Sequence, residues 1–282
     1  MSAARLVVVQ VRYQLKVFMR SPVAVFFTVM FPVLMLVLMN ALFAGDADIE
    51  GPGGEAWPVQ QFYVGGLSAF AAVSATFTNL ANVVPVRRDD GILKRWRSTP
   101  LPAWACIAGY VGSATIVAAV GVALTWGLGV AFYDITIDVA KLPVAVLTFV
   151  LAVGSFAALG LAVASLIRTA ESAPAVANAI ILPLGFVSSV FVPTADPPAW
   201  MAFLGDAFPL KPFAETFQDV FNPFVDPPAF VAHRLIRIAA WGVVGVAIAL
   251  WRFRWEPHRT SGAPGRRRGR GRGRQAPATT SG

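Results

Sequence analysis

Long runs of apolar residues alternate with short polar segments along the chain. Six of these runs are long enough to cross the hydrocarbon core of a bilayer, which takes about 20 mainly apolar residues in a helix. The pattern therefore predicts six membrane-spanning helices. They cover residues of roughly 23–43, 62–86, 105–131, 143–167, 174–192 and 235–251. The fifth run is short and bounded by prolines, so its limits are the least sharply marked.

The composition favours the same interpretation. Of the 282 residues, 56% are hydrophobic and only 13% are charged, whereas soluble domains carry about 25% charged residues. A soluble protein with so little charge would lack the polar surface it needs. We therefore predict an all-α polytopic membrane protein whose six-span transmembrane domain covers residues 23–256. The single cysteine, Cys106, excludes an internal disulfide and a multi-cysteine metal site.

Positive charge in the short loops predicts the orientation of the chain, because lysine and arginine concentrate on the cytoplasmic side. All but four of the 23 basic residues lie before the first run or after an even-numbered run. The four exceptions are Lys141, Lys211, Arg234 and Arg237. We therefore expect both termini in the cytoplasm and the protein in a plasma membrane, that of a bacterial cell.

The two ends of the chain carry basic segments. Arg5, Arg12, Lys16 and Arg20 fall on one helical face, so residues 1–22 are predicted to form an amphipathic elbow helix in the inner membrane interface. The alternative for this segment is a loosely ordered basic anchor. The Arg/Gly-rich residues 257–282 are predicted to be a disordered cytoplasmic tail near anionic lipids. Nucleic-acid binding is not expected of it.

The segment between the fifth and sixth runs is predicted to lie on the outer side. It alternates prolines with short aromatic amphipathic pieces, which are typical of extracellular re-entrant or interfacial helices. Arg234 and Arg237 follow at the start of the last run. They are expected to reach the outer interface or, alternatively, to contact an anionic lipid or substrate group.

The second run carries weakly polar residues. Four of them are candidates for lining a translocation path: Ser68, Thr76, Asn79 and Asn82. The alternative is that they pack helices together through small side chains and interhelical hydrogen bonds. The third to fifth runs contain no acidic residue, which argues against a carrier driven by protons or sodium.

The chain also lacks the residues of an ATPase or another enzyme. A phosphate-binding loop needs Gly-Lys followed by Ser or Thr, and no lysine here follows a glycine. A membrane-embedded enzyme would need clustered His, Asp or Glu, whereas His233 and His258 stand alone. We therefore expect a non-catalytic chain that binds no cofactor or metal itself.

One charged segment interrupts the apolar pattern, "RRDDGILKRWRSTPLPAW", over residues 87–104. Gly91 and the prolines at 100 and 102 predict a short helix between them, lying along the cytoplasmic membrane surface. The segment is longer than a hairpin connection requires, which suits a docking element for a cytoplasmic partner. An ordinary positively charged loop is the alternative.

The same region resembles a known family. "FYVGGLSAFAAVSATFTNLANVVPVRRDDGILKRWRSTPLPAWACIAGYVGSA" is similar to the permeases of type-2 ABC exporters, in particular the daunorubicin-resistance-like group. The matching residues are Arg88, Asp89, Asp90, Gly91, Leu93, Lys94, Arg95, Arg97, Thr99, Pro100 and Leu101, with Gly109 following. The departures are the two aspartates where glutamate is usual and Gly65-Gly66 where Pro-Gly is common. The resemblance covers residues of roughly 10–255.

The resemblance implies a function. The segment around residues 91–99 would be a coupling helix seated on a separate ABC ATPase, of which two copies bind ATP and magnesium. The implied coupling residues are Asp89, Asp90, Gly91, Leu93, Lys94, Arg95, Trp96, Arg97 and Thr99. A second permease chain, identical or homologous, would complete an exporter of hydrophobic or amphipathic cargo such as a drug, an antibiotic, a lipid or a glycolipid. The alternative is an ATP-independent membrane carrier or channel.

Overall fold

The computed structural model describes residues 2–43, 48–50, 56–97, 102–133, 135–193 and 197–252. Within these ranges, six helical stretches are long and apolar enough to cross a membrane. Their number and the helical class confirm the prediction of an all-α polytopic protein. The stretches are Pro22–Phe43, Val59–Asp89, Trp104–Tyr133, Val139–Leu166, Ala170–Val187 and Ala232–Arg252. The predicted tail at 257–282 lies outside the described residues.

Several of these stretches combine more than one helical element. The first contains α2 (Pro22–Val25), the π-helical turn η1 (Phe26–Met30) and α3 (Phe31–Phe43). The second contains α4 (Val59–Val73), the π-helical turn η2 (Ser74–Thr78) and α5 (Asn79–Asp89). The others are α7 (Ala103–Tyr133), η3 (Val139–Lys141) with α8 (Leu142–Leu166), η4 (Ala170–Ser172) with α9 (Ala173–Val187), and α12 (Ala232–Arg252).

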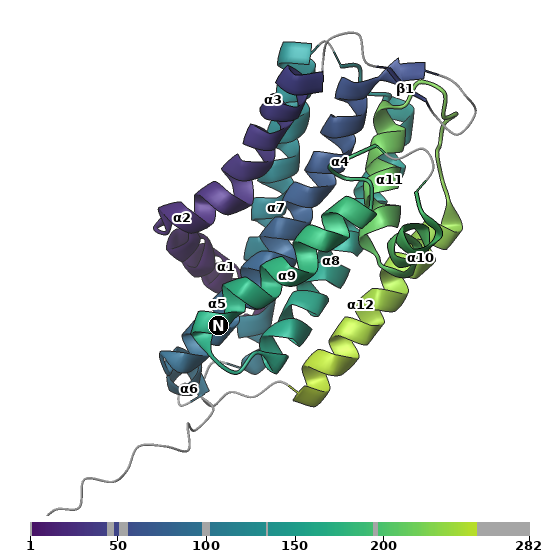
Figure 1. Cartoon of the computed structure of the whole chain (residues 1–282). Coiled ribbons are helices and arrows are strands. Elements are labelled where there is room, and N and C mark those ends of the chain that lie inside the picture. Colours follow the sequence, from purple (N-terminus) through teal and green to yellow (C-terminus); the bar gives the residue numbers. More distant parts are fainter. Residues whose placement is uncertain are drawn as a thin grey trace, which may run out of the picture.

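The remaining elements lie between or before these stretches. They are α1 (Ala3–Met19), β1 (Asp48–Glu50), β2 (Ala56–Pro58), α6 (Ile92–Arg97), α10 (Ala199–Ala207) and α11 (Leu210–Phe221). The strands β1 and β2 pair antiparallel in a short hairpin. Figure 1 shows α6 at one end of the bundle and β1 at the other. We refer to these as the α6 end and the hairpin end.

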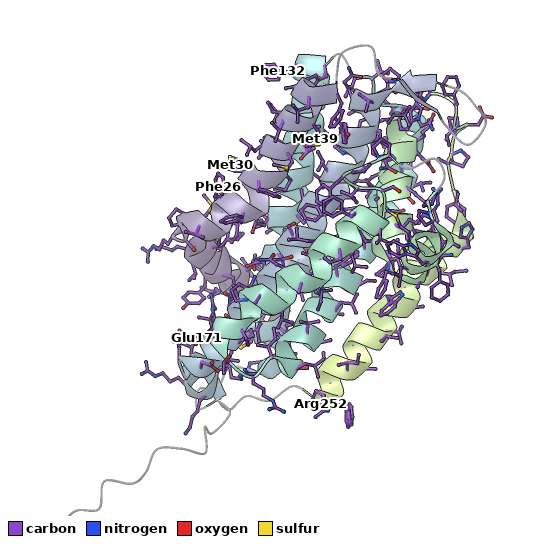
Figure 2. The ribbon with its side chains drawn as sticks, viewed as in Figure 1. Phe26, Met30, Met39, Phe132, Glu171 and Arg252 are labelled. Atoms are coloured by element: carbon purple, nitrogen blue, oxygen red, sulfur yellow. The ribbon has the colours of Figure 1, made fainter. Side chains whose placement is uncertain are left out.

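The second and fourth stretches form the centre of the bundle. In the most apolar 18 residues of these two stretches, 78% and 61% of residues are buried. The corresponding share in the stretch formed by α12 is 11%. The exposed face of α12 carries Ile236, Val243 and Leu250, as expected for a surface that meets lipid tails. In Figure 2, Phe132 marks the hairpin end, whereas Glu171 and Arg252 lie at the α6 end.

Small residues let the central helices approach closely. A Cβ atom added to Gly160 of α8 would lie 2.8 Å from the backbone oxygen of Phe77 in η2. One added to Gly245 of α12 would lie 2.8 Å from the backbone nitrogen of Leu159 in α8. Ser155 of α8 donates a hydrogen bond of 2.9 Å to the carbonyl oxygen of Ile238 in α12. Such contacts between small residues are how membrane helices associate where the solvent is itself apolar.

The helix α11 buries its apolar face in the bundle. Leu210, Phe213 and Phe217 are at most 1% exposed, and the helix packs against α4 and α8. Trp126 of α7 joins this packing, with its ring centroid 5.5 Å from that of Phe217. Figure 1 shows α11 beside α4 towards the hairpin end. The re-entrant character expected of this segment stays a prediction.

The N-terminal helix α1 packs across α7. Space for it depends on Gly109, where a Cβ atom would lie 2.6 Å from Cβ of Gln10. The four basic residues that predicted this helix are exposed: Arg5, Arg12, Lys16 and Arg20. The structure thus contains the predicted helix, while its position in a membrane interface stays a prediction.

Candidate functional site

The segment predicted to dock a partner begins with a sharp reversal of the chain. The helix α5 ends at Asp89, and Gly91 follows with φ of 71°. This is the left-handed region, which glycine enters without the penalty that a Cβ atom imposes. The carbonyl oxygen of Gly91 accepts a hydrogen bond of 3.1 Å from the backbone nitrogen of Arg95. Gly91 therefore ends one helix and begins α6.

Arg88 joins this reversal to the C-terminus of α8. Its side chain is 2% exposed, and one guanidinium nitrogen donates to the carbonyl oxygens of Ile167 and Arg168, at 2.7 and 3.1 Å. The last carbonyls of a helix have no partner within the helix and carry partial negative charge. Ile167 is the C-cap of α8 and Arg168 follows it, so the cation binds two carbonyl oxygens just past this negative helix end.

Asp89 contacts the start of the helical stretch that follows α8 in the chain. Its Oδ2 atom accepts a hydrogen bond of 2.7 Å from the backbone nitrogen of Ala170, the first residue of η4. Its Oδ1 atom lies 3.5 Å from Nε of Arg88. The two adjacent side chains thus bind the end of α8 and the start of the η4–α9 stretch. We call Arg88, Asp89 and the backbone of residues 167–170 the α6 bracket.

Arg87 connects the same helix end to α1 and α7. It donates a hydrogen bond of 3.2 Å to the hydroxyl oxygen of Tyr110. Its guanidinium carbon also lies 5.8 Å from the ring centroid of Tyr13 and 5.2 Å from that of Tyr110. Consecutive arginines therefore bind different neighbours, Arg87 towards α1 and α7, and Arg88 towards the α8–α9 connection.

The short helix α6 has one buried and one exposed face. Leu93 is 1% exposed and packs with Leu80, Val84 and Leu161 at the α6 end of the bundle. Lys94 and Arg95 are exposed. This arrangement fixes α6 to the bundle through an apolar anchor and turns cations outward.

The other predicted coupling residues are placed less fully. Asp90 is exposed at the C-cap of α5. Trp96 and Arg97 belong to α6, but only their backbone is described. Thr99 lies outside the described residues.

The four candidates for a translocation path separate into two pairs. Ser68 and Thr76 are fully buried between helices. Ser68 donates to the carbonyl oxygen of Gly65 and accepts from Nε1 of Trp126, at 2.8 and 2.9 Å. Thr76 donates a hydrogen bond of 2.8 Å to the carbonyl oxygen of Ala72. Ser68 therefore links α4 to α7, whereas the hydrogen bond of Thr76 stays within its own helical stretch.

Asn79 and Asn82 line a cavity instead. It has a volume of about 260 Å³ and lies between α1, α2, α5 and α7. Arg87 and Tyr110 are also part of its wall, which places it next to the α6 end.

A larger cavity lies between α3, α4 and α9. Its volume is about 570 Å³, and its wall also includes Ile49 of β1. Among the lining residues are Phe31, Met35, Met39, Tyr63, Leu182 and Phe186. The wall is almost entirely apolar, so the cavity suits a hydrophobic molecule. We call it the α3–α9 cavity. Sequence analysis missed it, because its lining residues look like any other residues of a membrane span.

A network of charges links α10, α11 and α12. Arg234 of α12 forms ion pairs with Asp219 and with Glu215 of α11, the second with an Nε–Oε2 distance of 3.1 Å. Arg237 lies 3.6 Å from Asp206 of α10, which also pairs with Lys211 at 3.0 Å. Arg234 and Arg237, predicted to reach the outer interface or contact a lipid or substrate, thus have carboxylate partners within the chain.

Comparison with known protein families gives one finding that spans most of these elements. The family model described as ABC-2 type transporter matches residues 5–222. The matched range includes most of α1, the α6 bracket, both cavities and α11. A comparison with curated proteins gave no match.

Proposed function

This chain belongs to the ABC-2 type transporter family, and from that premise we propose that it is the permease of an ATP-driven exporter. The family and the six apolar helices make it a multi-pass membrane protein and a membrane component of an ABC transporter. Two copies of a separate ATPase bind ATP and magnesium and supply the work. A second permease chain, identical or homologous, completes the complex.

The observation that carries this proposal is the construction of α6. If an ATPase is to move the spans of this chain, the helix that it binds must be rigidly attached to those spans. Leu93 anchors α6 in the bundle, and the α6 bracket ties its base to α8 and η4. Lys94 and Arg95 then offer positive charge to an acidic cleft on the ATPase.

The α6 end faces the cytoplasm in this proposal. The basic residues of α1, the arginines 87, 88 and 168, and Arg252 all belong to this end or to helices that reach it. Such an excess of positive charge is typical of the cytoplasmic side of a bacterial plasma membrane. The hairpin, α10 and the charge network then lie at the outer side.

The cargo is hydrophobic or amphipathic, a class that includes drugs, antibiotics, lipids and glycolipids. The α3–α9 cavity supports this choice, since its wall offers few polar groups to replace the water around a charged solute. The cavity is bounded by helices of the first, second and fifth spans. Motion of these helices relative to one another would change its volume.

Replacing Arg95 and Trp96 together with alanine should abolish coupling while leaving the spans in the membrane. The buried Leu93 anchor remains in this variant, so α6 keeps its apolar packing against the bundle. The chain is reconstituted in vesicles with its co-purifying ATPase, and ATP hydrolysis is measured together with efflux of fluorescent lipid and ethidium. We expect efflux of the transported probe to fall at least about tenfold, the effect of losing one or two interface anchors.

The matched control is Arg12→Ala, which removes an exposed arginine of α1. It should leave efflux within about twofold of the original chain, as for a surface charge outside the docking contact. Unchanged efflux in the double variant would contradict the role of α6. If no ATPase co-purified with the original chain, the proposal of an ATP-driven exporter would be wrong.

Filling the α3–α9 cavity should change which cargo is exported. Leu182→Trp adds volume to its wall, and steric exclusion should affect large hydrophobic probes before small ones. Efflux of a bulky fluorescent lipid is compared with that of ethidium in the same vesicles. Leu166→Trp is the control, because Leu166 is an exposed residue at the C-terminus of α8 and does not line the cavity. If the ratio of lipid efflux to ethidium efflux were the same in Leu182→Trp and Leu166→Trp, the cavity would not be part of the cargo path.

A further inference from the structure

We infer that Arg88 and Asp89 are positioning residues that transmit movement of α6 to α9 and thereby to the wall of the α3–α9 cavity. This inference rests on the proposed function, since it assumes that an ATPase acts on α6. It assigns the transmission to one pair of adjacent side chains. It also separates this step from the docking of the partner.

The first step of the argument is electrostatic. Arg88 carries a positive charge to the carbonyl end of α8, and Asp89 carries a negative charge to the amide end of the η4–α9 stretch. Each charge therefore meets the helix end of opposite partial charge. Hydrogen bonds between a charged side chain and a backbone group are stronger than neutral ones. The connection is thus held at two points of opposite sign.

The second step concerns burial. Arg88 is 2% exposed, and its positive charge is balanced within the bracket by Asp89 at 3.5 Å. A buried guanidinium that loses its acceptors is costly, because no water replaces them. A small displacement of α5 and α6 is therefore less costly if residues 167–170 move with them than if the hydrogen bonds break.

The third step is the path from the bracket to the cavity. The stretch bound by Asp89 begins with Ala170 and continues as α9, which carries Leu182 and Phe186 in the cavity wall. Only 22% of the residues in its most apolar window are buried, so few contacts with the bundle oppose its movement. Figure 1 shows α9 running from the α6 end obliquely across the bundle towards α4. A shift at its first turn therefore reaches the cavity.

The test follows the cavity wall and does not require the cargo to be known. In a Cys106→Ala background, Leu182→Cys places one thiol at the α3–α9 cavity. The full complex with its co-purifying ATPase is reconstituted in vesicles, and the labelling rate by a membrane-permeant maleimide is measured without nucleotide and with vanadate-trapped ATP. We expect ATP to change the labelling rate in this parent.

Two variants remove the bracket from opposite sides. Arg88→Gln and Asp89→Ala should each reduce the ATP-dependent change in labelling at least about tenfold, the effect of losing one charge-assisted hydrogen bond. ATPase association and ATP hydrolysis should remain, because the side chains of Arg88 and Asp89 bind backbone groups of this chain and Lys94 and Arg95 are unaltered. Asp89→Ala also covers the case in which Arg88→Gln does not fold, since the Asp89 side chain is 31% exposed.

Conservative variants distinguish positioning from folding. Asp89→Asn keeps an oxygen acceptor for the Ala170 nitrogen and should retain most of the response. Arg88→Lys keeps the charge but loses the Nε group that faces Asp89, and should retain part of the response. Arg12→Gln, an exposed arginine of α1, should leave the response unchanged.

The outcomes separate this inference from the function on which it rests. A full labelling response in both Arg88→Gln and Asp89→Ala would overturn the inference, and so would a parallel loss of ATPase association and labelling response in both. A parent chain that binds no ATPase would overturn the proposed function instead. Retained hydrolysis with a lost response, rescued by Asp89→Asn, is the result that supports the bracket.

Discussion

Replacing Gly65 with alanine should strongly reduce the stability of the folded bundle. The helices α4 and α11 touch at this position, where a Cβ atom would lie 2.6 Å from Cα and 2.7 Å from the backbone nitrogen of Gln218. The carbonyl carbon of Phe217 would be 2.9 Å away. Backbone atoms cannot rotate aside as a flexible side chain does, so the two helices must separate. Overpacking of this kind costs about 1–3 kcal/mol or more.

The separation should also disturb contacts that depend on the position of α11. Phe213 and Phe217 fill the core beside α4, and Gln218 donates a hydrogen bond of 3.0 Å to the carbonyl oxygen of Ser189. We therefore expect a clear fall in melting temperature of the purified chain in detergent. Size-exclusion chromatography with fluorescence detection after heating measures the fraction that remains folded.

A glycine without neighbours provides the control for this experiment. Gly154 in α8 would place a Cβ atom in open space, with nothing within 4 Å. Because alanine favours a helix interior over glycine by about 1 kcal/mol, Gly154→Ala should leave the melting temperature unchanged or raise it. Similar melting curves for the two variants would show that the α4–α11 contact is not as close as described.

Replacing Arg234 with methionine should release α12 from α11. Arg234 pairs with Asp219 and Glu215, and its side chain is 17% exposed. Removing one partner of a largely buried pair leaves the other charge without compensation, which costs about 3–5 kcal/mol when burial is complete. We expect a value of roughly 3 kcal/mol, near the lower limit, because these groups keep some contact with solvent. Melting temperature in detergent is again the measurement.

Neutralising the carboxylates should restore part of this loss. In the triple variant Arg234→Met, Glu215→Gln and Asp219→Asn, no unpaired charge remains between the two helices. Its melting temperature should lie well above that of Arg234→Met alone. Arg252→Met is the control at the α6 end, where the arginine is exposed and should contribute within about 0.5 kcal/mol. If Arg234→Met alone were as stable as Arg252→Met, the charge network would not contribute to stability as proposed.

The pH dependence of the Arg234→Met variant gives a further check. Burial raises the pKa of Glu215, and Arg234 and Lys211 oppose this rise. The folded chain therefore binds the Glu215 proton more tightly than the unfolded chain, which favours folding at acidic pH, and this contribution is lost as pH rises through the folded pKa. Without Arg234 the pKa rises further. The stability deficit of the variant should therefore be smaller at mildly acidic pH than at neutral pH.

The number of spans could be predicted from the sequence because it depends on local composition. An apolar run of sufficient length must form a helix in lipid, since no other backbone structure satisfies its own hydrogen bonds there. The start of α6 was also predictable, because Gly91 and the following amphipathic residues lie next to each other in the chain. The family membership followed from the same short segment.

The α6 bracket could be predicted only in part. The resemblance marked Arg88 and Asp89 as members of a motif, but Arg88 binds the carbonyl of Ile167, 79 residues further along the chain. Nothing in the intervening sequence marks Ile167 as a partner of Arg88, or Ala170 as the partner of Asp89. Backbone acceptors and donors are present at every position, so only the meeting of α5 with the α8–α9 connection selects which of them are used.

In the charge network, the sequence identified the cations but not their carboxylate partners. Arg234 and Arg237 stood out in the sequence as cations at the edge of an apolar run, and they were expected to reach the outer interface or to contact an anionic lipid or substrate group. Their carboxylate partners lie on α10 and α11, which read as separate short amphipathic pieces. The structure turns the charged face of α11 towards α12 while its aromatic face enters the core.

By itself, the sequence determined the class of this protein, its six spans and the position of the short helix α6, because each follows from neighbouring residues and their transfer into lipid. Only the tertiary structure decided which helix ends Arg88 and Asp89 bind, which cations are neutralised within the chain and where the α3–α9 cavity opens. In a membrane, apolar side chains are about equally stable against lipid and against another helix. Close contact of small residues and a few polar groups therefore selects the arrangement, and these contacts join positions far apart in the chain.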